Sequence, residues 1–186
     1  MMQATTDLMK EHRGIELMLR VLGAISARAG AGEALDTGEL DGILEFLTVF
    51  ADKCHHGKEE DILFPALEAV GIQRSHGPIG VMLLEHTEGR AIIKRLKDAV
   101  AEYKAGDRTA ANRIASAGDD YAALLSQHIQ KEDKVLYPMG DERLTPEKDA
   151  ELVAAFEEIE RERIGPSRHE EFHAMLHRLE AKYLKG

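Results

Sequence analysis

The sequence HHGKEEDILFP at residues 55–65 is repeated in outline by HIQKEDKVLYP at residues 128–138. When the two segments are aligned on their aromatic-proline ends, His55 matches His128 and Glu59 matches Glu132. A histidine and a glutamate four residues apart lie on the same face of an α-helix. The chain is therefore expected to contain two helices that carry matching His/Glu pairs.

The helix before each of these segments carries a single histidine. His12 lies 43 residues before His55, and His86 lies 42 residues before His128. Apolar residues at helical spacing surround both single histidines, which predicts that they face a core. The sequence thus reads as two copies of one helix pair, and it predicts a bundle with approximate twofold symmetry.

Turn-forming residues divide the chain into helices of the length found in bundles. Four long helices joined by short loops favour an antiparallel, up-down arrangement, and two shorter helices must then cover its outside or one end. Asp36 and Glu39 are spaced as a capping box at the start of the second helix. The expected fold is all-α, one domain over residues 1–186, with long helices to about residue 29 and over about 36–70, 78–105 and 107–138, and covering helices within about 145–184.

The second helix offers two overlapping pairs, His55/Glu59 and His56/Glu60, and its apolar periodicity fits both. The repeat selects His55/Glu59. His56 and Glu60 are then expected outside the ligand set, where they could form hydrogen bonds with metal-bound imidazoles. Metal-bound imidazoles usually need such a bond.

The fourth helix carries one clear apolar stripe at helical spacing. Tyr121, His128, Glu132 and Val135 all belong to it, whereas Asp133 points away from it. Glu132 is therefore expected to face the core.

Composition excludes several classes of protein. The net charge of −10 and the pI near 5.4 argue against nucleic acid or an anionic membrane as a partner, since both require clustered basic residues. No apolar run approaches the roughly 20 residues that span a bilayer. The N-terminus lacks the pattern of a secretion signal. A single cysteine rules out a disulfide framework, so a cytoplasmic location is expected.

Four helices are thus expected to direct imidazoles and carboxylates to one level of an apolar core. Buried carboxylates are costly unless a cation or strong hydrogen-bond donors meet them. A closed His/Glu hydrogen-bond network is the alternative to a metal site. Nitrogen and carboxylate ligands without thiolates favour iron or manganese over structural zinc. The residues concerned are His12, His55, Glu59, His86, His128 and Glu132.

Four segments, EHRGIE, CHHGKEEDILFP, GPIGVMLLEHTEGR and HIQKEDKVLYP, resemble the hemerythrin-like, HHE cation-binding family over about residues 7–140. The similarity is strongest with bacterial di-iron members, and it implies a four-helix bundle around two iron ions joined by an oxo or hydroxo group. It also implies that those same six residues are the metal ligands, with Glu59 and Glu132 bridging. Arg90 stands where oxygen carriers of the family have a further histidine.

The resemblance implies binding of a small oxidant or gas, namely O₂, NO or peroxide, with a role in oxidative or nitrosative stress as one possibility. Counting ligands for two six-coordinate ions leaves about two positions for such a molecule or for a further ligand. The alternative is an iron-sensing or iron-holding module without turnover. Any peroxide- or O₂-reactive enzyme activity stays open.

HEEFH at residues 169–173 matches the HExxH motif of zinc proteases, which is a remote alternative function. The motif begins in the first turn of its helix, with no strand-rich domain around it. Several other residues lie where they could approach the metal site, although an ion-paired, covering or core role is the simpler reading for them. They are Glu16, Tyr121, His169, His173 and His177, while Cys54 is expected to be a buried small residue, and Glu11 and Glu85 are expected at the surface.

Overall fold

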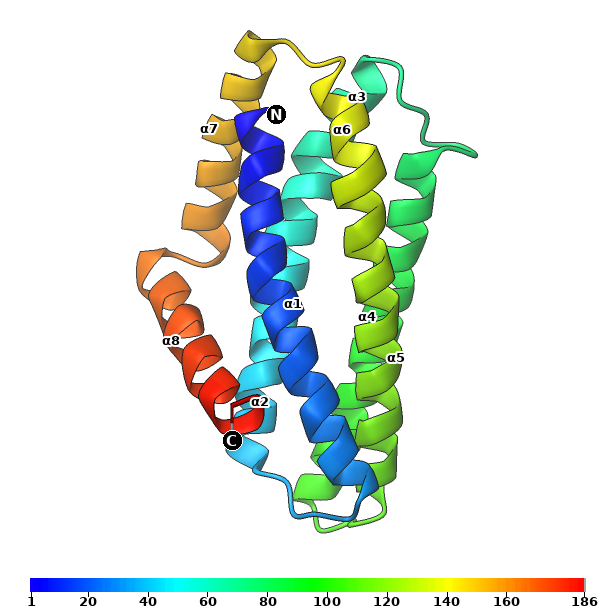
Figure 1. Cartoon of the computed structure of the whole chain (residues 1–186), viewed down its shortest axis with the longest axis vertical. Coiled ribbons are helices and arrows are strands. Elements are labelled where there is room, and N and C mark those ends of the chain that lie inside the picture. The colour runs from blue at the N-terminus through cyan, green and yellow to red at the C-terminus, as the bar shows by residue number, and fades with distance from the viewer. Residues whose placement is uncertain (186) are drawn as a thin grey trace.

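The computed structural model describes residues 1–185 and shows helices joined by short loops (Figure 1). The prediction of an all-α bundle is confirmed, and no strand occurs among the residues described. No helix in the described part of the chain is long and apolar enough to cross a membrane. The helices are α1 (Gln3–Gly30), α2 (Thr37–Glu45), η1 (Phe46–His56), η2 (Glu59–Leu63), α3 (Phe64–Ala69), α4 (Pro78–Lys104), α5 (Ala110–Lys131), η3 (Glu132–Leu136), α6 (Tyr137–Asp141), α7 (Pro146–Arg163) and α8 (Pro166–Tyr183).

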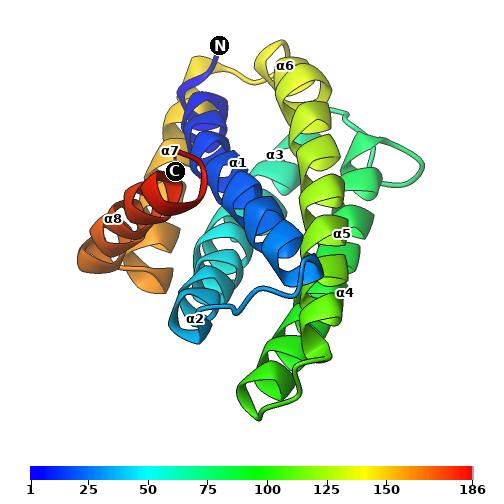
Figure 2. The ribbon, with the colours of Figure 1, turned by 60° about the horizontal axis from the view of Figure 1, so that its bottom comes forward.

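Four long rods form the bundle. They are α1, the continuous run from α2 to α3, α4, and the run from α5 to α6, and successive rods point in opposite directions (Figures 1 and 2). The rod of α5 packs along both α1 and α4. Gly118 permits the close approach of α5 to α1, because a β-carbon at this position would overlap Ser26 Oγ.

Two apolar cores lie one above the other inside the bundle. The first includes Leu8, Phe64 and Leu136, and the second includes Ile15, Leu47 and Ile92, all of them buried. The predicted histidine level lies between these cores, since His12 follows Leu8 and precedes Ile15 on α1. Apolar side chains therefore shield the polar level from both ends.

Three segments of the second and fourth rods are π-helical, with hydrogen bonds from residue i+5 to residue i. The N–H of Gly57 reaches the carbonyl of Asp52, and the N–H groups of Phe64 and Tyr137 reach those of Glu59 and Glu132. The last two bonds occupy equivalent positions in the two halves, so the wide turns belong to the repeat. They also correct one prediction: Val135, which was placed on the inward stripe, is 49 % exposed, while Leu136 and Tyr137 are buried.

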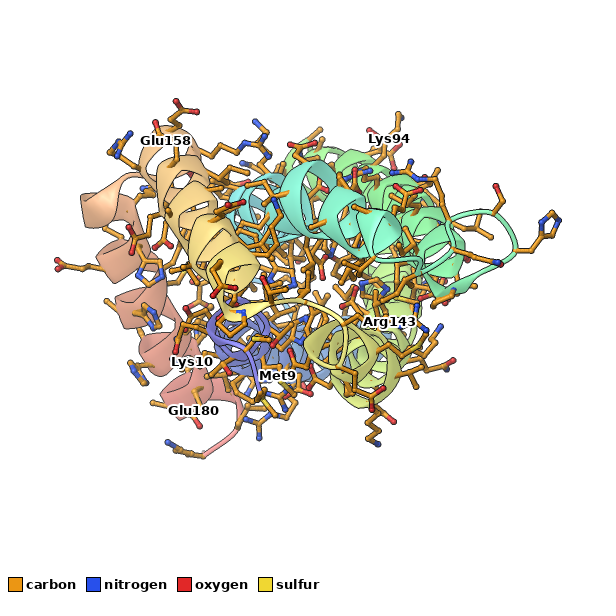
Figure 3. The ribbon with its side chains drawn as sticks, turned by 90° about the horizontal axis from the view of Figure 1, so that it is seen from above. Met9, Lys10, Lys94, Arg143, Glu158 and Glu180 are labelled. Carbon is orange, nitrogen blue, oxygen red and sulfur yellow. The ribbon has the colours of Figure 1, made fainter. Side chains whose placement is uncertain are left out.

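The two C-terminal helices lie along the outside of the bundle, against α1 and the second rod (Figures 1 and 3). Arg163 of α7 donates to the carbonyl of Lys53 at 2.7 Å, and a β-carbon at Gly57 would overlap its guanidinium group. Asp36 caps α2 as predicted, by accepting from the N–H groups of Gly38 and Glu39. The side chain of Glu39 does not complete a capping box, because it binds residues of α8 instead.

Candidate metal centre

The structure brings the six predicted residues together at one level of the bundle. The first and third rods contribute one side chain each, the second and fourth rods contribute two each, and all six are buried. They are His12, His55, Glu59, His86, His128 and Glu132, with exposed fractions of 0 to 1 %.

Their ligand atoms form two neighbouring groups, each compact enough to surround one metal ion. Glu59 belongs to both groups, and the atoms within a group lie within 4.8 Å of one another. Glu132 also faces both sides, because its Oε2 lies 3.3 Å from Nε2 of His12 and 3.3 Å from Nε2 of His128. One group contains His56, Glu59, His86 and His128, and the other contains His12, His55, Glu59 and Glu132.

Several of these atoms have no hydrogen-bond partner although they are buried. They are Oε2 of Glu59, both carboxylate oxygens of Glu132 and Nδ1 of His56. The Nε2 atoms of His86 and His128 are 3.1 Å apart. The pairs do not close into the hydrogen-bonded network considered as an alternative, and an uncompensated carboxylate in such a place is costly. The donor set and its unsatisfied oxygens therefore fit bound cations.

His56 lies inside this cluster, not outside it as predicted. Its ring stacks on that of His86 with centroids 4.0 Å apart, and it is 4 % exposed. The π-helical turn explains the correction, because it lets the adjacent residues His55 and His56 both face the core. The corresponding residue of the second half is Ile129, so this fifth imidazole breaks the repeat.

Carboxylates surround the cluster and hold the imidazoles by their Nδ1 atoms. Glu60 accepts from His86 at 2.7 Å, which confirms that it acts from outside. Asp133, which points away from the core as predicted, still reaches His12 at 2.6 Å. Two other predictions are corrected: Glu11 and Glu85, expected at the surface, reach His55 at 2.8 Å and His128 at 3.0 Å. Such bonds fix the tautomer that leaves Nε2 free to bind a metal.

These outer contacts follow the twofold repeat. Glu11 and Glu85, which each precede a single histidine, contact the histidine of the next rod. The acids that follow Glu59 and Glu132 in the sequence each contact the single histidine of the other half of the repeat. A lysine supports each first contact: Lys58 donates to Glu11 at 2.5 Å, and Lys131 pairs with Glu85. The acids and lysines that contact the imidazoles from outside therefore recur at equivalent positions of the two halves, and this recurrence is the sequence signal that could have identified them.

The two lysines differ in their exposure to solvent. The side chain of Lys58 is 3 % exposed and also contacts Glu160 of α7 at 3.2 Å, whereas that of Lys131 is 40 % exposed. Helix α7 therefore buries the outer contacts of one half only.

Without a bound metal, protons on the imidazoles can balance the charge of the buried carboxylates. Burial opposes a charge on His12, but its hydrogen bond with Asp133 and the nearby carboxylates of Glu132 and Glu59 outweigh it and raise its pKa to about 10. Burial opposes a charge on His86 too, but the nearby carboxylate of Glu59 and the hydrogen bond with Glu60 raise its pKa to about 9. A metal ion would have to displace such protons, since it binds neutral imidazole.

Tyr137 is a site residue that the sequence analysis used only as an alignment marker. Its hydroxyl donates to Oε1 of Glu59 at 2.6 Å and lies 3.5 Å from Nε2 of His12, on which the ring also stacks. Its counterpart, Phe64, stacks on His86 and has no hydroxyl. The two groups of ligands therefore have different walls, one with a hydroxyl and one without.

The remaining candidates stay outside the cluster. Glu16 forms an ion pair with Arg13 at 2.8 Å, and Tyr121 lines a cavity beside His56 and His86. Burial raises the pKa of the Cys54 thiol to about 12, so it is an unreactive core residue.

The HExxH residues lie on α8, away from the cluster. The rings of His169 and His173 meet edge to face, and neither residue belongs to a metal-binding group among the described residues. Glu170 and His177 are exposed. Among the described residues, no metal-binding group forms around His169 and His173 to supply the third ligand that a catalytic zinc requires.

An antiparallel four-helix bundle with a buried set of imidazoles and carboxylates defines a helical cation-binding protein. The sequence model of the hemerythrin HHE cation binding domain matches residues 3–140. The chain belongs to this family.

Relatives of this chain occur in mycobacteria. Uncharacterized proteins from Mycobacterium tuberculosis and Mycobacterium bovis are 25 % identical to this chain over 162 residues, which is 87 % of the chain and 63 % of theirs. The chain thus spans less than two thirds of the length of these relatives. No solved structure shows significant similarity to it.

Proposed function

We propose that the cluster holds two iron ions and binds a small oxidant or gas, O₂, NO or peroxide. In this proposal Glu59 and Glu132 would be shared by the two ions, His56, His86 and His128 would hold one ion, and His12 and His55 would hold the other. The observation that carries it is the pair of ligand groups sharing Glu59, with buried carboxylate oxygens that no hydrogen bond satisfies.

The choice of iron follows from the donor set. Imidazole and carboxylate ligands suit iron, whereas structural zinc favours tetrahedral sites with thiolates. Cys54 belongs to neither group among the described residues. Carboxylates on facing helices are also the ligands of other di-metal bundles.

His56 changes the count of open positions. With four imidazoles and two bridging carboxylates the sequence left about two positions, and a fifth imidazole leaves about one. His56 thus supplies the nitrogen that Arg90 cannot. We assign the remaining position to the side of His12 and His55, which has one imidazole fewer. Iron in such a position would supply affinity for small diatomic or peroxide molecules and would exchange electrons with them.

The residues around His12 and His55 favour binding of a small polar ligand. Tyr137 holds a proton at its hydroxyl, because burial raises its pKa well above the usual value and Glu59, the group it donates to, raises it further. The apolar cores above and below exclude bulk water, which strengthens interactions with a polar ligand. The single buried cysteine suits a reducing compartment, and a cytoplasmic location is part of the proposal.

Metal analysis with a visible spectrum tests the proposal. About two irons per chain, with charge-transfer bands in the visible range, are expected. One zinc per chain and a featureless spectrum would overturn it.

Stopped-flow mixing of the reduced protein with peroxide separates the two uses of such a centre. Repeated consumption of peroxide indicates an enzyme. A single stoichiometric oxidation indicates a carrier, or the iron-sensing or iron-holding module that is the alternative.

A further inference from the structure

A cavity of about 350 Å³ opens beside the cluster, between η1, α4 and α5. Its buried walls include Leu47, Ile93 and Tyr121, and it reaches His56 and His86. Exposed basic residues form its rim, and one of them, Lys94, lies on the side of the molecule away from α8 (Figure 3). The cavity is therefore apolar within, basic at its mouth and free of the C-terminal helices.

The sequence repeat shows what creates this space. Gly89 occupies the position that Ile15 has in the first half, and Asp52 occupies the position that Leu125 has in the second. Ile15 and Leu125 are 1 % and 3 % exposed and belong to the apolar core. The cavity lies where large apolar side chains have been replaced by a glycine and a short acid.

The charges at the mouth favour an anion. Asp52, the one acid among the described residues of the lining, is already paired with Arg90 at 2.8 Å. Lys94 pairs with Asp98 at 2.7 Å in an exposed contact of little strength. Lys97 forms no ion pair within the described residues. Two lysines thus stand at the mouth of an apolar cavity, in a chain whose net charge is −10.

We propose that this cavity binds a medium-chain aliphatic carboxylate. Its volume lies at the lower end of small-molecule pockets, which suits a chain of roughly eight to ten carbons. The carboxylate lies between Lys94 and Lys97, and the chain runs inward along Leu47, Ile93 and Tyr121. This inference goes beyond the proposed function, because the binding does not require a metal.

Titration calorimetry with decanoate tests the proposal on the protein as purified, with its metal content recorded. Decanoate below its micelle concentration should bind one molecule per chain. Decanol lacks the charge and decyltrimethylammonium reverses it, so both should bind at least tenfold more weakly. Equal binding of all three would show that the basic rim has no role and would overturn the proposal, as would the absence of decanoate binding.

Two substitutions probe the walls and the rim separately. A β-carbon at Gly89 would lie 3.6 Å from Tyr121, an ordinary contact, and the rest of a Gly89→Leu side chain would extend into the cavity that Gly89 lines. Circular dichroism checks that this variant folds. The substitution should abolish decanoate binding. Lys97→Glu should weaken it about fivefold, whereas Lys134→Glu should not, because Lys134 is an exposed lysine that lines no part of this cavity.

The outcomes distinguish this inference from the metal proposal. Decanoate binding that survives Gly89→Leu, or that responds equally to Lys97→Glu and Lys134→Glu, would place the ligand elsewhere and overturn the cavity assignment. Bound iron without decanoate binding would reject the cavity proposal alone. Decanoate binding without iron would support it and reject the di-iron proposal.

Discussion

Glu11 lies 2.8 Å from Nδ1 of His55, so a carboxylate of the first rod orients an imidazole of the second. The carboxylate also binds Lys58, and the pKa of Glu11 is lowered because contacts with His55 and Lys58 outweigh the cost of burial. A residue outside the ligand groups therefore ties together two rods and α7, which Lys58 reaches through Glu160.

Glu11→Gln should weaken metal binding at the proposed centre. The substitution removes the charge that favours the correct His55 tautomer, and changes of this kind cost about 10- to 100-fold in metal affinity. It also leaves the buried Lys58 with only Glu160, so the free energy of unfolding should fall by about 1–3 kcal/mol. Metal titration and urea unfolding measure the two effects.

Glu85→Gln is the matched variant in the other half. It should weaken metal binding similarly but destabilise the protein less, because its lysine, Lys131, is 40 % exposed. Glu16→Gln serves as the surface control. Equal loss of stability in the Glu11 and Glu85 variants would contradict the role given to α7.

His56→Ala should lower the metal content toward about one ion per chain. The substitution removes one of three imidazoles from a group that also contains Glu59. Element analysis after dialysis measures the loss. His173→Ala, on α8, is the histidine control and should retain both ions. If the His56 variant keeps its full metal content and affinity, His56 is not a metal ligand.

Tyr137→Phe should keep the metals but destabilise the metal-free protein by about 1–2 kcal/mol, because Glu59 loses a buried hydrogen bond. Metal binding should offset this loss, since ions would satisfy the same carboxylate. Thermal unfolding with and without bound iron gives the comparison. Equal destabilisation in both forms would mean that the tyrosine only fills space.

The fold was predictable because the repeat restricts it at several levels at once. Matching His/Glu segments gave the register of the second and fourth rods, and Pro78 and Gly106 mark loop boundaries that the structure confirms. The apolar periodicity alone did not distinguish His55 from His56. Comparison of the two halves supplied the missing constraint.

What the sequence did not reveal depends on the π-helical turns and on side-chain reach. The repeat selected His55/Glu59 and so assigned His56 to the outside, and helical periodicity, which assumes a constant turn, assigned Val135 to the inside; both assignments were wrong. Asp133, which does point away from the core, still reaches His12 through its side chain. Residues beside the inward stripe can therefore contact the site from outside.

Stability should depend on pH through Glu39, which anchors α8 to the bundle. Its carboxylate accepts from Arg178 at 3.0 Å, Lys182 at 2.8 Å and Tyr183 at 2.6 Å. Burial opposes the charge, but the contacts with Lys182 and Tyr183 outweigh it and lower the pKa of Glu39 in the folded protein. Its stabilising effect is therefore fully present above the unfolded pKa of about 4.5, and it is lost as the pH falls from there through the lower folded pKa.

Urea unfolding of the wild type and Glu39→Gln at pH 7 and pH 3 measures this contribution. At pH 7 the variant should be less stable by about 1–2 kcal/mol, and the difference should shrink at pH 3. Glu33→Gln, at an exposed position before α2, should show no difference at either pH. A difference between wild type and Glu39→Gln that stays constant or grows in acid would mean that the glutamate acts through its shape and not through its charge.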